Sequence, residues 1–100
     1  MAPEKLYLTL YVSSTDARAM ELVEKLRSTL KESYTGEWNI DVVDVIAAPE
    51  KASENNVFAT PTLARDFPEP VVKVLGEIAN EKKILAVLTK MNHDTSVVII

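Results

Sequence analysis

The chain has 100 residues, of which 47% are hydrophobic and 26% are charged, a composition that predicts a folded core rather than general disorder. Eleven Lys and Arg against fifteen Asp and Glu give a net charge of −4, which argues against a dedicated nucleic-acid-binding protein. The absence of cysteine excludes disulfides, zinc–thiolate sites and thiol redox chemistry. With no disulfide, no secretory leader and no apolar run long enough to span a bilayer, the sequence predicts a cytoplasmic protein that does not bind membranes.

The first half of the chain predicts a strand, a helix and a second strand. Residues 6–12 are apolar almost throughout, which is typical of a strand buried on both faces. Any of the four residues Ser13 to Asp16 could cap a helix that ends near Ser33. The second strand runs from Trp38 to Ile46 and should pair in parallel with the first. The helix between them has one apolar stripe, formed by Ala19, Leu22, Val23, Leu26 and Leu30.

The second half predicts a helix, two strands and a last helix. The first of these helices begins at Pro49 and ends at Asn55-Asn56. Strands follow from Thr62 to Arg65 and from Val71 to Leu75. Asn80 caps the last helix, whose apolar face consists of Ile84, Leu85, Leu88 and Met91.

The resulting order, βαβαββα, indicates an α/β thioredoxin-like fold over residues 1–100, a single domain with an apolar tail at 91–100. A proline at the start of the third strand supports this assignment, and the fold implies that the Thr60–Pro61 bond is cis. The position of a redox site, Ser13 to Asp16, holds no cysteine, so disulfide exchange is impossible. A glutathione-activating hydroxyl at Ser13 or Ser14 remains as an alternative, enzymatic interpretation.

Other chemical signals are weak. His93 is the only histidine, and a lone histidine beside Asp94 is more typical of a solvated side chain than of a ligand or base. Asp41 and Asp44 lie three apart on a predicted strand and point to opposite faces, so they form no acid–base pair. With two glycines there is no phosphate-binding loop. We therefore predict a non-enzymatic protein without a metal or other cofactor.

Several segments, in one order along the chain, resemble the KaiB family of circadian clock proteins. The resemblance runs from about Leu6 to Met91. KaiB proteins are not enzymes; they bind the ATPase KaiC, sequester KaiA and promote KaiC dephosphorylation. The resemblance therefore implies a KaiC-like ATPase as partner, with KaiA as a second candidate. It rests on Leu10-Tyr11-Val12, Ala59-Thr60-Pro61-Thr62-Leu63-Ala64, Phe67-Pro68-Glu69-Pro70-Val71, Lys73-Val74-Leu75-Gly76-Glu77-Ile78 and Lys83-Ile84-Leu85.

The same resemblance implies two alternative folds. The family has a tetrameric ground state, βαββααβ, and a monomeric thioredoxin-like state that binds KaiC. We expect the monomeric state, with a dimer or tetramer as the alternative, because three of the five residues 71–75 are β-branched and favour a strand. The residues implied in switching or in cis-proline geometry are Pro61, Pro68, Pro70, Val87 and Thr89, the last two standing where the family has Gly and Asp.

The expected partner surface combines Arg18 and Lys25 of the first helix with residues preceding Ala59, including Asn56. Three other functions remain open at this stage. One is a stress or signalling adaptor with the same fold and a different partner. The others are the KaiB-like sensor domain of a clock-associated histidine kinase and the glutathione-binding enzyme named above.

Overall fold

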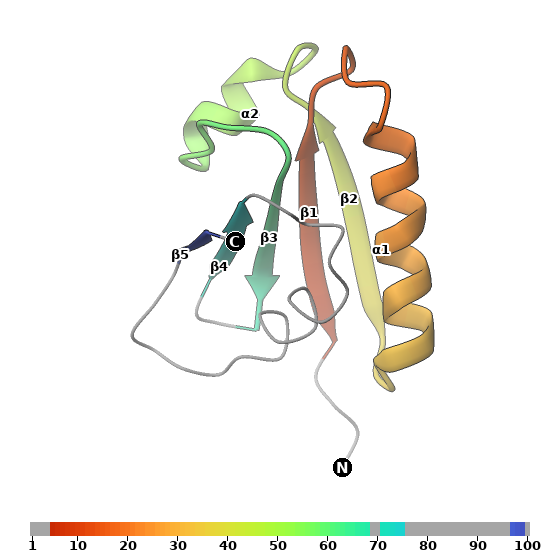
Figure 1. Ribbon diagram of the computed structural model, residues 1–100. Coiled ribbons are helices and arrows are strands. Elements are labelled where there is room, and N and C mark those ends of the chain that lie inside the picture. Colours follow the sequence, from red (N-terminus) through yellow and green to blue (C-terminus); the bar gives the residue numbers. More distant parts are fainter. Residues whose placement is uncertain (1–4, 69–70, 76–96, 100) are drawn as a thin grey trace.

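The computed structural model describes residues 5–68, 71–75 and 97–99. Within these ranges the predicted order of elements is confirmed as far as the fourth strand (Figure 1). The predicted last helix from Asn80 lies outside the described residues. The elements are β1 (Leu6–Val12), α1 (Ala19–Ser33), β2 (Trp38–Asp44), α2 (Pro49–Glu54), β3 (Thr62–Phe67), β4 (Val72–Leu75) and β5 (Val97–Ile99).

The strands form one five-stranded sheet in the order β2-β1-β3-β4-β5. β1 and β2 are parallel, as predicted, with Leu6 opposite Trp38 and Val12 opposite Asp44. β3 is antiparallel to both β1 and β4. Because parallel strands finish at the same edge of a sheet, β1 and β2 end where the antiparallel β3 begins, and this edge carries the connecting loops.

Helix α1 covers one face of the sheet. The predicted apolar stripe is confirmed: Leu26 and Leu30 are fully buried, Val23 is 6% exposed, and Ala19 and Leu22 are partly buried against the same cluster. They pack with alternate residues of β1, namely Leu6, Leu8, Leu10 and Val12. In the described part of the chain, neither helix is long and apolar enough to cross a membrane.

Helix α2 packs on the opposite face and covers only part of it. The cluster there consists of Tyr11, Ala52, Val57 and Ala64. With six residues, α2 does not reach the start of β1, where Tyr7 is 44% exposed. The expectation that β1 is buried on both faces along its length is therefore wrong, because the second covering element is too short.

The ends of several elements differ from the prediction. The helix proper begins at Ala19 with Arg18 at the N-cap position, and one of the predicted capping residues, Asp16, accepts the free backbone N–H of Arg18 in the turn before it. β2 ends at Asp44, two residues early, because the Asp44 carboxylate accepts the backbone N–H of Ile46 and forms a turn. β3 continues to Phe67, two residues beyond the predicted end.

The two segments that follow Pro70 have a direct bearing on the fold. Residues 72–75 form strand β4, as the β-branched composition predicts, and not the helix of the alternative family fold. Part of the apolar tail forms the short strand β5, parallel to β4, with Lys73 opposite Val97. The sequence marked residues 91–100 as an apolar tail but did not indicate that residues 97–99 extend the sheet.

Candidate functional site

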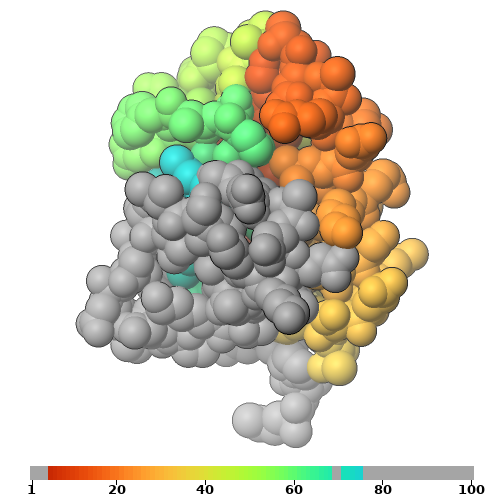
Figure 2. All heavy atoms as spheres, in the orientation of Figure 1, coloured from red at the N-terminus to blue at the C-terminus, as the bar shows by residue number. Residues whose placement is uncertain are grey.

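Three loops gather at the edge where β1 and β2 end and β3 begins (Figure 1). They comprise residues 13–18, 45–48 and 55–61. On the face shown in Figure 2, the red-orange and green segments that include these loops occupy one end of the molecule. In a thioredoxin-like fold this is the position of the redox site, so we treat it as the first candidate site.

Asp44 holds two of these loops together. One oxygen of its carboxylate accepts the backbone N–H of Ser14 at 3.1 Å and that of Ile46 at 3.0 Å. The bond from Ile46 is the main reason why the pKa of Asp44 lies below its usual value. The hydroxyls of Ser13 and Thr15 are hydrogen-bonded at 2.7 Å. These polar groups, among them the Ser13 hydroxyl that the sequence left open to glutathione chemistry, fix the shape of the loop.

Asp16 orients Arg18 through hydrogen bonds to its backbone and side chain. The Asp16 carboxylate accepts the backbone N–H of Arg18 at 2.9 Å and its Nε–H at 3.4 Å. The backbone bond is the main cause that lowers the pKa of Asp16 below its usual value. The Arg18 side chain is 81% exposed, so this exposed ion pair orients the guanidinium without adding much stability.

The four predicted partner residues divide between two places. Arg18, Asn56 and Ala59 lie in the loops at the sheet edge, whereas Lys25 lies seven residues, about 10 Å, further along α1. Lys25 borders a shallow hollow of about 410 Å³ on the outer side of α1. The predicted surface is therefore not one compact patch.

Two exposed apolar residues at the sheet edge were missed. Phe58 is 86% exposed and Ile46 is 60% exposed. Val57, beside Phe58, is only 7% exposed, so adjacent apolar residues have opposite environments. No sequence signal separates them, because hydrophobicity alone does not say which of two adjacent loop residues enters the core. Together with the sheet-edge residues above, they define the sheet-end surface: Arg18, Ile46, Asn56, Phe58 and Ala59.

The prolines predicted to matter are partly described. Thr60–Pro61 is cis, the isomer that the thioredoxin-like fold implies, and Phe67–Pro68 is also cis. The Thr62 hydroxyl donates to the Ala59 carbonyl at 2.7 Å beside the first of these bonds. The other predicted residues, Pro70, Val87, Thr89 and His93, lie outside the described ranges.

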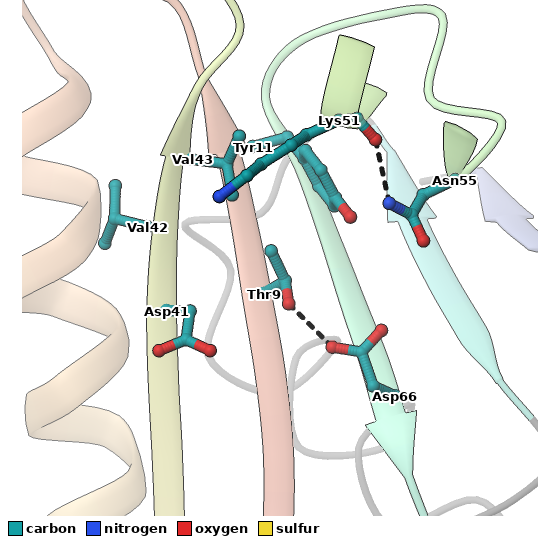
Figure 3. Close-up of a pocket in the computed structure, with 8 residues that line it drawn as sticks. All are labelled: Thr9, Tyr11, Asp41, Val42, Val43, Lys51, Asn55 and Asp66. Atoms are coloured by element: carbon teal, nitrogen blue, oxygen red, sulfur yellow. Dashed lines mark hydrogen bonds between the residues drawn. The ribbon is translucent and has the colours of Figure 1, made fainter. Parts of the chain in front are cut away.

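A second candidate site lies on the face that α2 leaves open (Figure 3). It is a groove of about 480 Å³, and Asp41, one of its lining residues, stands opposite Thr9 in the sheet. The Thr9 hydroxyl donates to Asp66 Oδ2 at 2.6 Å. Among the residues that the structure places, no group of three His, Cys, Asp or Glu could hold a metal ion. We call this site the α2-face groove; its lining is Thr9, Tyr11, Asp41, Val42, Val43, Lys51, Asn55 and Asp66.

Solved structures similar to this one show the fold. The solution structure of the N-terminal domain of Synechococcus elongatus SasA matches with a TM-score of 0.67 and 20% identity, covering 84% of this chain and 79% of that one. Mitochondrial thioredoxin 3 from Saccharomyces cerevisiae matches with a TM-score of 0.65 and 17% identity, over 83% of this chain and 76% of that one. The fold is thioredoxin-like.

Sequence comparisons give the family. The circadian clock oscillator protein KaiB of Synechococcus sp. (strain RCC307) is 33% identical over 97 residues, 96% of this chain and 88% of that protein. The KaiB protein of Prochlorococcus marinus (strain MIT 9312) is 36% identical over 86 residues, 85% of this chain and 82% of that protein. The KaiB domain model matches residues 9–90, and the chain therefore belongs to the KaiB family.

Proposed function

We propose that this chain is a regulatory protein, without catalytic activity of its own, that binds a KaiC-like ATPase and changes its phosphorylation state. The observation that carries the proposal is the KaiB domain match over residues 9–90, a range that includes the whole sheet-end surface. The relatives are named circadian clock oscillator proteins, a regulatory and not a catalytic role. We propose further that the chain acts in the cytoplasm as a single-domain monomer and that KaiA is a second partner.

The sheet-end surface has the composition of a binding surface. Phe58 at 86% exposure and Ile46 at 60% are apolar groups that gain free energy when a partner removes them from water. Arg18, in another loop at the same edge of the sheet, supplies a charged group of the kind enriched at binding hot spots. The hydrogen bonds of Asp44 and Asp16 hold the loops at 13–18 and 45–48 in place, so these two loops lose little conformational entropy on binding.

Binding of the purified chain to a KaiC-type ATPase, measured by biolayer interferometry, tests the proposal. We expect Phe58→Ala and Arg18→Ala each to weaken binding about tenfold or more, the effect of removing a hot-spot side chain. Lys31→Ala is the matched control, because Lys31 is exposed and basic but lies in the last turn of α1, far from the sheet-end surface.

The phosphorylation state of the ATPase, followed by gel mobility over time, is the second readout. We expect the wild-type chain to accelerate dephosphorylation and the Phe58→Ala variant to do so less. A wild-type chain that neither binds the ATPase nor changes its phosphorylation would contradict the proposal and favour an adaptor with a different partner.

A further inference from the structure

The α2-face groove offers a binding site on a different surface from the sheet end. It lies on the part of the sheet that the six-residue helix α2 leaves uncovered, and Figure 3 shows side chains from β1, β2, β3 and α2 converging on it. Thr9 and Tyr11 reach it from β1, the strand between β2 and β3, because alternate residues of a strand point to the same face. The groove is therefore built from several elements of the sheet, which fix its shape.

The charge of the groove is dominated by two carboxylates. Asp41 and Asp66 are both exposed and stand on strands at either side of β1. Asp66 accepts the Thr9 hydroxyl through Oδ2, and Asp41 accepts the side-chain amide of Asn39 at 3.2 Å, both bonds from neutral donors. Lys51 also lines the groove, but within the described ranges it forms no ion pair with either carboxylate. Both negative charges therefore remain available to a cation.

Tyr11 adds an independent indication of a ligand. Its side chain is only 4% exposed, and its hydroxyl points into the groove (Figure 3). Among the residues that the structure places, the hydroxyl has no hydrogen-bond partner. The ring is buried, and the hydroxyl at its tip faces the open groove, where a ligand can reach it. A ligand that sits near Asp66 and carries hydrogen-bond donors or acceptors can therefore bond to this hydroxyl.

An aromatic surface continues from the groove along the same face. The rings of Tyr7 and Phe67 meet edge to face, with centroids 6.1 Å apart, and are 44% and 46% exposed. Lys5 Nζ lies 5.2 Å from the centroid of the Tyr7 ring, so this surface already attracts a cation of the chain itself. Exposed aromatic rings next to carboxylates favour a group that is both planar and cationic.

We propose that the α2-face groove binds an arginine side chain of a partner protein, with the guanidinium between Asp41 and Asp66 and the adjoining partner segment over Tyr7 and Phe67. Arginine fits better than lysine because its planar fork donates to two carboxylates at once and stacks on aromatic rings. The aromatic surface beyond the groove favours a protein segment over a free amine, since it gives the residues next to the arginine a place to pack. This inference does not depend on the proposed function, because the groove and the sheet-end surface share no residue.

Nuclear magnetic resonance titration of the ¹⁵N-labelled chain with N-acetyl-arginine amide tests the site. We expect saturable shifts of the amides of Thr9, Tyr11 and Asp66, with a dissociation constant in the millimolar range that is typical of one side chain. N-acetyl-lysine amide should bind several-fold more weakly, and N-acetyl-glutamine amide should not bind.

Variants assign the binding to the groove. The double change Asp41→Asn and Asp66→Asn keeps the side-chain shape and should weaken arginine binding by about tenfold or more. Glu50→Gln, an exposed change on α2 outside the groove lining, is the matched control and should leave binding unchanged. The unaltered remainder of each spectrum shows that the variants are folded.

Three results would overturn the inference. These are an absence of saturable shifts in the wild-type chain, equal binding by the double variant, and lysine or putrescine binding as tightly as arginine. The last result would assign the groove to small amines instead of a partner's arginine. A peptide with one arginine flanked by apolar residues should bind more tightly than the capped amino acid, and a failure to do so would remove the aromatic surface from the proposal.

Discussion

Replacing Leu26 with alanine tests how α1 is held on the sheet and thereby how the loop before it is positioned. The Leu26 side chain is 0% exposed and belongs to the cluster formed with β1. Truncating a fully buried leucine removes its transfer free energy and leaves a cavity, at a cost of about 3 kcal/mol. A domain of this size has an unfolding free energy of about 5–15 kcal/mol, so the variant should still fold but should lose a large part of that free energy.

Urea unfolding followed by far-ultraviolet circular dichroism measures the effect. With a denaturant dependence of about 1–1.5 kcal/mol per molar urea, the midpoint should fall by about 2–3 M. Met20→Ala is the control on the same helix, because Met20 is 71% exposed, and it should change the unfolding free energy by less than about 0.5 kcal/mol. A loss below about 1 kcal/mol for Leu26→Ala, or equal losses for both variants, would refute the packing described here.

Three further predictions follow from buried, charged and edge groups. Thr29→Val should raise the unfolding free energy in urea by about 1 kcal/mol, because the Thr29 hydroxyl is buried without a hydrogen-bond partner in the described part of the chain; a decrease would contradict this. Asp44→Asn should make the stability of the fold less sensitive to acid, because the pKa of Asp44 is lowered in the folded state. The ionised carboxylate therefore stabilises the fold at a pH above its unfolded-state pKa of about 3.9, and this stabilisation is lost as the pH falls through the lower folded-state pKa. The urea midpoints of the wild type and of Asp44→Asn at neutral pH and at about pH 2 measure this effect. An equal fall of the midpoint in both proteins on acidification would contradict a stabilising role for the hydrogen bonds of Asp44. Deleting residues 97–100 should speed amide hydrogen exchange in β4, which becomes an edge strand; unchanged exchange would mean that β5 protects nothing.

Most of the fold could be predicted from periodicity. The spacing of Ala19, Leu22, Val23, Leu26 and Leu30 has a direct physical cause, since each residue on one side of a helix meets the same sheet face. The strand at 72–75 followed from β-branched residues in the same way. These features depend on local preference and burial acting in the same direction, which a sequence displays.

The rest depends on contacts between distant residues. Whether Tyr7 is buried depends on how far α2 reaches across the sheet, and the sequence of β1 does not contain that length. β5 forms because residues 97–99 meet β4, a pairing across more than twenty residues that no local pattern specifies. Phe58 points outward because its neighbour Val57 fills the space beneath α2.

One candidate site could be predicted from the sequence, whereas the other could be recognised only in the structure. Arg18, Asn56 and Ala59 were predicted through resemblance to the KaiB family, and they lie in loops at one edge of the sheet. The α2-face groove was not found, because Asp41 and Asp66 are 25 positions apart and come together only through the pairing of β2 and β3 with β1. In sequence each is an ordinary strand carboxylate.

Binding of a KaiC-type ATPase through the sheet-end surface is tested most directly by a map of amide chemical-shift changes in the ¹⁵N-labelled chain on addition of a KaiC-type ATPase domain. We predict that a complex forms and that the largest changes or losses of signal fall on the sheet-end surface, at Arg18, Phe58 and Ala59, with the amide of Lys31 unaffected. The absence of a complex, or changes confined to the last turns of α1, would contradict it.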